Sequence, residues 1–247
     1  MLRRSSGLPT LPGAMKGLLE GTKRRLKRSR RRRAVGRAYD MALEIARVIP
    51  RGSSVLDVGC GNGFIAHHLT GMLRTNVVGL DVAKQTEASI PYVPYNGRHF
   101  PVKDESFDVI LLCYVLHHAQ EFYLVMNEVK RVLREGGLVI VYEDMPLGQL
   151  DRFVCGIHNR KWRDRTGPCT FQLAAGWRFL FGLTGFEIVS ERTLSRWRNL
   201  AHPVSRRFFL LRANGSQIER SESTAQACPH DEVKVGLKWP RSAGTTS

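Results

Sequence analysis

The chain has 247 residues, of which 43% are apolar, enough to bury the core of one or two domains. This excludes a short peptide-binding module and a wholly disordered polymer. Lysine and arginine number 38 against 22 aspartate and glutamate, and the resulting net charge of +16 suits a partner that carries phosphate or another anionic surface. The five cysteines stand in no metal-ligand or redox spacing, which favours a reducing, intracellular compartment.

The N-terminal segment carries most of the positive charge. Nine of the eleven residues from Lys23 to Arg33 are lysine or arginine. Because such a density of like charge repels itself, we expect residues 1–35 to form a disordered basic arm. The arm is either a solubilising extension or a clamp for nucleic acid or an anionic membrane surface. We expect a cytoplasmic location. The alternative is import into mitochondria, because the basic, serine-containing start of the chain also fits a transit peptide.

Helix and strand signals alternate from residue 36 to residue 212, which we take as one domain. The apolar spacing predicts helices over 39–49, 65–73 and 122–133, and strands over 53–58, 76–81, 107–113, 138–142, 186–190 and 208–211. Two prolines make 90–95 an irregular strand at best. This order predicts an α/β fold, a doubly wound, mostly parallel seven-stranded sheet with helices on both faces. No run is apolar and long enough to span a membrane, and residues 213–247 are expected to be a disordered tail.

A glycine-rich turn follows the first long strand. Asp57, Gly59, Gly61 and Gly63 stand at its carboxyl end, where open parallel sheets collect ligands. Glycines allow a sharp turn and a close approach to a ligand, and the next helix presents its N-terminal amides. Asp81 ends the second strand, where a carboxylate can accept hydrogen bonds from both hydroxyls of a ribose. The pattern predicts a cofactor that contains a nucleoside.

The spacing within this turn distinguishes between cofactors. A dinucleotide fingerprint needs a third glycine where Phe64 stands, and the lysine of a nucleoside-triphosphate loop is missing. Asp57 precedes the first glycine by two residues, and there it can meet an ammonium group directly or through water. S-adenosylmethionine carries such a group, and the dinucleotide has none at that point. We therefore expect S-adenosylmethionine.

Four stretches of the chain, in order, resemble the motifs of class I S-adenosylmethionine-dependent methyltransferases. They are residues 55–63, 78–81, 100–110 together with 115–118, and 132–138. The sequences of these stretches are most similar to the subgroup that includes ubiquinone and menaquinone biosynthesis methylases. The resemblance covers about residues 36–212. It implies the Rossmann-like methyltransferase fold and an enzyme that uses S-adenosylmethionine.

The resemblance also implies roles for single residues. Gly59, Gly61 and Gly63 would pass along the methionine part of the cofactor, Asp57 would lie near its amino group, and Asp81, followed by Val82, would take the ribose hydroxyls. Asn96 and Gly97 stand where relatives often carry an aspartate for the adenine amino group, and backbone near Cys113 would border the sulfonium. Residues 82–89 are shorter than the helix usual there, so the adenine side departs from the family pattern.

Methyl transfer from a sulfonium needs mainly alignment of the reacting atoms and a dry pocket. A base is needed only where the nucleophile must lose a proton, and His117, after the strand that faces the cofactor, is the candidate for it. A structural role at that turn is the alternative. Residues 145–176, where substrate lids sit, carry basic and aromatic side chains that suit an anionic or flat aromatic acceptor, or else a solvated helix face.

We expect no metal site, because Cys155, His158 and Cys169 lack a fourth partner at a recognised spacing. The sequence favours transfer of a methyl group to oxygen, nitrogen or carbon of a small-molecule or lipid-like acceptor. One alternative is an RNA methyltransferase that grips phosphate with the basic arm. Another is a non-catalytic binding protein on the same fold. The sequence names neither the acceptor nor the oligomeric state.

Overall fold

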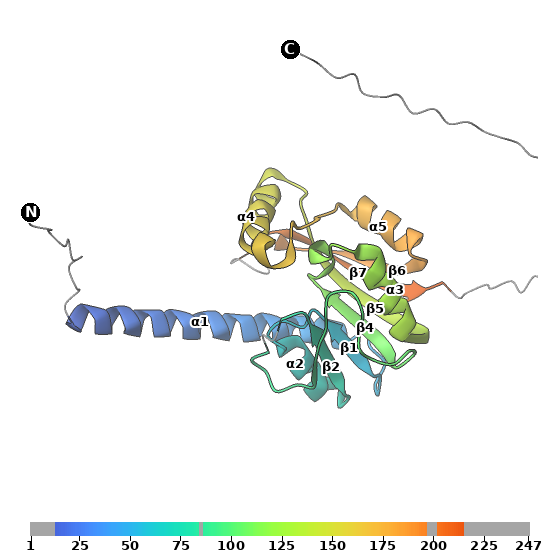
Figure 1. The fold of residues 1–247 in the computed structure, drawn as a ribbon, viewed down its shortest axis with the longest axis horizontal. Coiled ribbons are helices and arrows are strands. Elements are labelled where there is room, and N and C mark those ends of the chain that lie inside the picture. The colour runs from blue at the N-terminus through green and yellow to red at the C-terminus, as the bar shows by residue number, and fades with distance from the viewer. Residues whose placement is uncertain (1–12, 84–85, 197–201, 215–247) are drawn as a thin grey trace, which may run out of the picture. The chain divides into compact units, whose positions relative to one another are not determined.

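One seven-stranded sheet organises the part of the chain that the structure describes. A computed structural model describes residues 13–83, 86–196 and 202–214 (Figure 1). The strands are β1 Val55–Val58, β2 Val77–Asp81, β3 Tyr92–Pro94, β4 Phe107–Cys113, β5 Leu133–Met145, β6 Phe186–Leu194 and β7 Ser205–Ala213. They lie in the order β3-β2-β1-β4-β5-β7-β6. Except for its first two residues, the tail expected from residue 213 lies outside the described ranges.

The strand pairing produces a ligand-binding edge. Strand β1 pairs in parallel with both β2 and β4, and β5 pairs in parallel with β4, whereas β7 runs antiparallel between β5 and β6. The chain therefore winds in opposite directions from β1 and β4, and in open α/β sheets ligands bind at the carboxyl ends of the strands where the direction reverses. This arrangement confirms the predicted doubly wound, mostly parallel fold.

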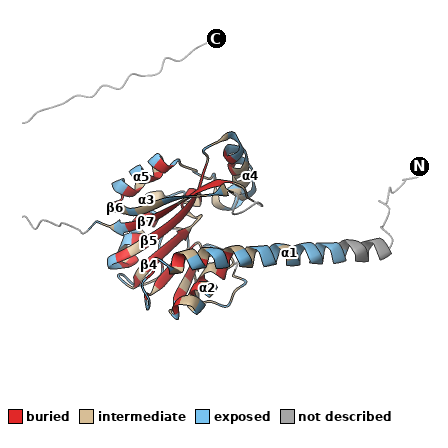
Figure 2. Ribbon diagram, turned by 180° about the vertical axis from the view of Figure 1, so that it is seen from behind, coloured by how far each residue is buried: buried red, intermediate tan, exposed pale blue. Residues whose placement is uncertain are grey.

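Helices cover both faces of the sheet. Helices α1 Gly13–Ala46 and α2 Phe64–Leu73 pack on one face, and α3 Phe122–Val132 and α5 Ala174–Leu183 pack on the other. Figure 2 shows the buried strands between these two helical layers. Helix α4 Gln149–Thr166 and the short helix η1 Leu116–His118 follow β5 and β4, at the edge where ligands are expected. Among the described helices, none combines the length and apolar character needed to cross a bilayer.

The start of β5 differs from the prediction. We expected the preceding helix to run to residue 133 and the strand to begin at residue 138, with two glycines between them. In the structure, α3 ends at Val132 and Leu133 is already extended, buried and paired with Phe107. The pairing register shifts between Phe107 and Val109, and Gly136 takes a left-handed φ of 72°. The glycines therefore lie in an irregularity within the strand instead of ending the helix.

The basic segment also differs from the prediction. We expected residues 1–35 to be disordered, but residues 13–35 belong to the continuous helix α1, while residues 1–12 lie outside the described ranges. Lysine and arginine are good helix formers, and the end of the helix is fixed by buried Ala38, Ala42 and Ile45. Arg31 forms an ion pair with Glu87 at 3.0 Å. The lysines and arginines from residue 23 to residue 33 are exposed on this helix.

Candidate active site

The three glycines after β1 serve different purposes. All have left-handed φ angles, 68° at Gly59, 52° at Gly61 and 75° at Gly63. A Cβ at Gly59 would lie 2.4 Å from a methyl group of Val115, and one at Gly63 would lie 2.9 Å from Ile90. These two glycines are needed for close packing within the protein. A Cβ at Gly61 would have no atom of the described residues within 4 Å, so within this part of the chain the glycine faces open space at the carboxyl edge of the sheet.

Two carboxylates lie beside this turn. Asp57 is 1% exposed, and its Oδ2 has no hydrogen-bond partner among the described residues. Burial, reinforced by the negative charge of Asp81, raises the pKa of Asp57 to about 7. The carboxylate of Asp81 accepts hydrogen bonds from the amides of Gly61 at 2.8 Å and Ala83 at 3.0 Å. The turn therefore contains a buried oxygen of Asp57 that a cationic donor would satisfy.

The residues expected on the adenine side lie after β2 and β3. A Cβ at Gly97 would lie 3.6 Å from Val82, whose side chain is more than half exposed. The Oδ1 of Asn96 accepts hydrogen bonds from the amides of Arg98 and His99. This oxygen is thus already used within its own turn, and a role for Asn96 toward adenine stays a prediction.

Three histidines meet beyond the end of β4. His117 and His118 end η1, and His158 lies on α4. Nε2 of His158 lies 3.4 Å from Nε2 of His117 and 3.1 Å from Nε2 of His118. His117 is fully buried, its Nδ1 lies 2.6 Å from Oε2 of Glu143, and its ring stacks on Phe171. The proposed base is therefore held between a carboxylate and a second imidazole.

The surroundings of these imidazoles give them different proton affinities. Burial by itself would lower the pKa of His117, but the charge of Glu143 and its hydrogen bond outweigh burial and leave this pKa above its ordinary value. Burial, followed by the charge of His117, lowers the pKa of His118 to about 3 and that of His158 to about 4. At neutral pH the two half-buried imidazoles are therefore neutral.

Comparison with known proteins identifies the domain. Residues 56–141 match the family model described as a methyltransferase domain. Residues 56–141 therefore form a methyltransferase domain, in agreement with the resemblance of their motifs to class I S-adenosylmethionine-dependent methyltransferases. The matched range contains the glycine turn, both carboxylates, and strands β2 to β4.

Methyltransferases that are named for different substrates are similar to this chain. The chain is 33% identical over 108 residues to the sterol 24-C-methyltransferase erg6 of Schizosaccharomyces pombe, covering 38% of this chain and 29% of that protein. It is 30% identical over 101 residues to the ubiquinone biosynthesis O-methyltransferase of Rhizobium etli, covering 36% and 40%. It is 25% identical over 145 residues to a tRNA U34 carboxymethyltransferase of Hahella chejuensis, covering 47% and 45%. The chain thus spans less than half the length of these relatives.

A solved structure shares the fold of the methyltransferase domain. It is the complex between the Haloferax volcanii Trm112 methyltransferase activator and a methyltransferase, matched with a TM-score of 0.59. The match covers 75% of this chain and 94% of that chain at 15% sequence identity, so the likeness concerns the fold alone.

The family and the fold imply S-adenosylmethionine as the cofactor, and the residues of the turn fit it. Its ammonium group would satisfy the buried Oδ2 of Asp57, which has no partner among the described residues. The open space at Gly61 leaves room for a bound molecule where a larger side chain would fill it. Cys113, at the end of the adjacent strand β4, is half-buried at the same edge of the sheet.

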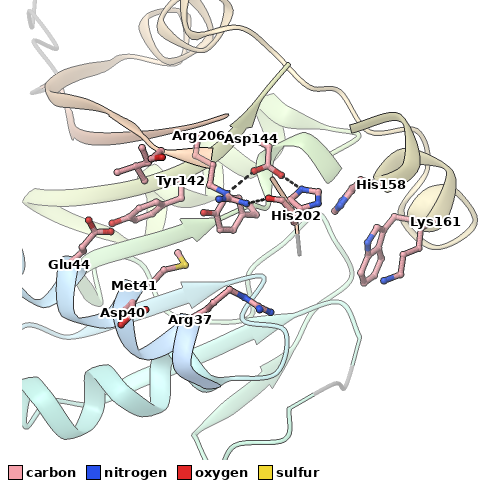
Figure 3. Close-up of a pocket in the computed structure, with 14 residues that line it drawn as sticks. Arg37, Asp40, Met41, Glu44, Tyr142, Asp144, His158, Lys161, His202 and Arg206 are labelled. Carbon is pink, nitrogen blue, oxygen red and sulfur yellow. Dashed lines mark hydrogen bonds and ion pairs between the residues drawn. The ribbon is translucent and has the colours of Figure 1, made fainter. Parts of the chain in front are cut away.

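A cavity of about 360 Å³ lies beyond the carboxyl ends of β4 and β5 (Figure 3). Its wall is formed by α1, α4 and the ends of β5 to β7, with lining residues Arg37, Asp40, Met41, Glu44, Tyr114, Tyr142, Asp144, His158, Lys161, Trp162, Leu194, Ser195, His202 and Arg206. In Figure 3, Asp144 is joined to both His202 and Arg206, at 2.8 and 3.2 Å. Tyr114 directly follows Cys113, so the cavity adjoins the edge where the cofactor is expected.

Part of this site could not be predicted from the sequence. Nothing in the sequence links His158 to the histidine pair forty residues earlier, because α4 brings it there only in the folded chain. The metal set that we considered and set aside contained His158 but paired it with Cys155 and Cys169. The contribution of α1 had a readable signal, since the lining residues of this helix recur at positions 37, 40, 41 and 44, the spacing of one helix face.

Proposed function

We propose that the chain transfers a methyl group from S-adenosylmethionine to oxygen, nitrogen or carbon of a small-molecule or lipid-like acceptor. The observation that carries this proposal is the cavity of about 360 Å³ that Tyr114 lines directly after the end of β4. Its volume lies within the range of roughly 300–1,000 Å³ that is typical of small-molecule sites. An acceptor held there would lie at the sheet edge that the cofactor shares.

The residues of the turn would hold the cofactor as the sequence predicts. Asp57 would bind its ammonium group, and Asp81 would accept from the ribose hydroxyls with the lone pairs that its two amide contacts leave free. Backbone of Gly59, Gly61 and Gly63 would follow the methionine part, and the remaining contacts would come from Val82, Asn96, Gly97 and Cys113. The bound cofactor supplies an electrophilic methyl group and a leaving group that departs neutral.

The protein contributes alignment, exclusion of water and, for acidic nucleophiles, a base. His117 is the proposed base. Its Nδ1 faces Glu143, so the proton would reach its Nε2 by way of His158, whose Nε2 lies 3.4 Å away and which lines the cavity. The Glu143 carboxylate would fix the orientation of the ring and stabilise the protonated imidazole. An acceptor that already carries a lone pair, such as an amine, needs no such step.

The lining of the cavity favours an acceptor with an apolar part. Tyr114, Tyr142 and Trp162 offer aromatic surface, while the charged side chains of the wall are of both signs. The outer surface of α4 supports a lipid-like acceptor. Its exposed apolar side chains Leu150, Phe153 and Ile157 stand among arginines, a composition that suits contact with an anionic lipid surface.

RNA is the second candidate acceptor. The exposed basic side chains of α1 would contact phosphate, and the family includes the tRNA-directed relative described above. Binding of this kind would weaken steeply with salt and would depend on the segment from Lys23 to Arg33. The cavity by itself favours a small acceptor, because its volume would admit only a small part of a polynucleotide.

Incubation with methyl-labelled S-adenosylmethionine and a fractionated cell extract tests the proposal. Label should enter the lipid or small-metabolite fraction and should be absent when Gly61→Val protein replaces the wild type. Label confined to the RNA fraction would reverse the order of the two candidates. Cofactor binding without label in any fraction would favour the non-catalytic alternative.

A further inference from the structure

The three histidines beyond β4 direct the same ring atom toward a common point. Nε2 of His158 lies 3.4 Å from that of His117 and 3.1 Å from that of His118, and one ring nitrogen from each of the three histidines lies within 4.8 Å of the other two. They come from two elements, η1 and α4, that are joined only by the fold. Among the described residues, these histidines form the cluster with ligand atoms close enough to share a metal ion.

Hydrogen bonding among the imidazoles cannot satisfy this arrangement. A neutral ring nitrogen offers either one proton or one lone pair. Nε2 of His158 faces two other ring nitrogens, so its single proton or lone pair serves one of them and leaves the other unmatched. A cation at the common point would accept a lone pair from each of the three nitrogens at once.

We propose that His117, His118 and His158 bind a divalent transition-metal ion, with Zn²⁺ as the best match. In a tetrahedral zinc site with bonds of 2.0–2.1 Å, ligand nitrogens lie about 3.4 Å apart. Both measured separations from His158 are close to this value. Neutral imidazoles suit zinc, copper, nickel and iron, whereas Mg²⁺ and Ca²⁺ prefer oxygen ligands.

The groups behind the imidazoles leave the Nε2 atoms free to bind a metal ion. Oε2 of Glu143 lies 2.6 Å from Nδ1 of His117, the carboxylate–histidine pairing that commonly supports metal ligands. Nδ1 of His118 faces Oγ1 of Thr166 at 3.0 Å and Sγ of Cys169 at 3.4 Å. Both Nδ1 atoms therefore have partners of their own. The thiol of Cys169 lies on the Nδ1 side of His118, so it supports this ligand instead of adding a fourth.

Three protein ligands leave one position of a tetrahedral ion open. His158 also lines the cavity next to β5, so this position is available to water or to an oxygen of a molecule bound there. Metal binding would use the Nε2 lone pair of His117 that the proposed base requires, so the two roles are alternatives for this atom. The metal site can be tested without an acceptor and without turnover.

Titration of the chelator-treated full chain with Co²⁺ tests the proposal. We expect one Co²⁺ per chain, with the intense visible absorption bands of a four-coordinate ion. Zn²⁺ should displace Co²⁺, and excess Mg²⁺ should not. Absence of stoichiometric Co²⁺ binding, or weak bands typical of six-coordinate Co²⁺, would overturn the proposal.

Variants locate the binding site. His118→Gln and His158→Gln should each weaken Co²⁺ binding by more than the roughly 10–100-fold that loss of a group behind a ligand costs. His67→Gln, which changes an exposed histidine on α2, should bind Co²⁺ as the wild type does. Circular dichroism of each variant confirms that it is folded. Equal affinity in the wild type and in folded His118→Gln and His158→Gln proteins would show that Co²⁺ binds elsewhere.

Discussion

Asp57 and Asp81 lie on the neighbouring parallel strands β1 and β2, and the charge of Asp81 adds to burial in raising the pKa of Asp57 to about 7. The cofactor's ammonium group would bind the ionised form of Asp57. Below pH 7 that form must be produced by releasing a proton, so cofactor affinity should rise about tenfold per pH unit up to pH 7 and then level off. Calorimetry between pH 5.5 and 7.5 measures this dependence.

The Asp57→Asn variant is the control for this pH dependence. It keeps the shape of the side chain but removes both the charge and the titration. We expect weaker cofactor binding at pH 7 and no rise with pH. If the variant and the wild type showed the same slope, the titrating group would be another residue and Asp57 would not bind the ammonium group.

Gly61→Val should abolish cofactor binding while the domain stays folded. The new side chain would occupy the open space in front of the turn, and its left-handed backbone would cost about 1–3 kcal/mol of stability. Gly52→Val is a matched control, because Gly52 also has a left-handed φ, 81°, and open space around it, but lies in the turn before β1. Both variants should lose similar stability, and calorimetry should find cofactor binding only in Gly52→Val. Binding by both would contradict the assigned pocket.

The sheet was predictable because buried parallel strands are continuous apolar runs, as at residues 107–113, and because glycine and proline mark their ends. Helix α1 was not predictable in the same way. The density of like charge in its sequence indicates repulsion between neighbouring side chains and so predicts disorder. In the structure, packing of Ala38, Ala42 and Ile45 fixes the last turns, and the helix continues from them toward the N-terminus. The start of β5 was missed because two glycines within a strand irregularity look like the end of a helix.

Acid should destabilise the chain in part through His118 and His158. Their folded-state pKa values, about 3 and about 4, lie below the ordinary 6.5, so the unfolded chain binds protons that the folded chain does not. Stability should therefore fall as pH decreases from 7 toward 4, by at most about 1.4 kcal/mol per pH unit for each imidazole and less because both are partly exposed. The raised pKa of His117 acts oppositely, since its stabilisation is present below pH 6.5 and is lost as pH rises through the folded-state pKa.

Urea unfolding in the presence of chelator measures this acid sensitivity. The His118→Gln/His158→Gln double variant should lose less stability than the wild type between pH 7 and pH 5. His67→Gln should follow the wild-type curve. An unchanged curve for the double variant would show that these two imidazoles do not titrate differently on unfolding.

Asp151→Ala should destabilise the chain by about 1–3 kcal/mol, the usual effect of leaving buried hydrogen-bond donors without their partner. The buried Asp151 carboxylate accepts from the amides of Gly148 and Ser205 and pairs with Arg196 at 3.2 Å, and so joins the start of α4 to β7. Asp164→Ala, which changes an exposed residue of the same helix, should alter stability by less than about 0.5 kcal/mol. Equal unfolding midpoints for the two variants would mean that Asp151 does not fasten α4.

The site divides into a part that sequence can reveal and a part that it cannot. The turn predicted to bind the cofactor is a local pattern, since Asp57 and the three glycines lie within seven residues. Their spacing can therefore be recognised in the sequence alone. The cavity and the histidine cluster depend on contacts between η1, α4 and α1, which no local pattern encodes. His117 was identified from its place after β4, whereas its relation to His158 and Glu143 exists only once the chain has folded.

Helix α1 joins an exposed cationic surface to the wall of the acceptor cavity without a break. Arg25 and Met41 are sixteen positions apart on it, which corresponds to about 24 Å along the helix axis. A polyanion or bilayer bound at Arg25 would be kept at that spacing from the cavity wall. The length of the helix would then set the distance between a ligand held at Arg25 and the residues of α1 that line the cavity.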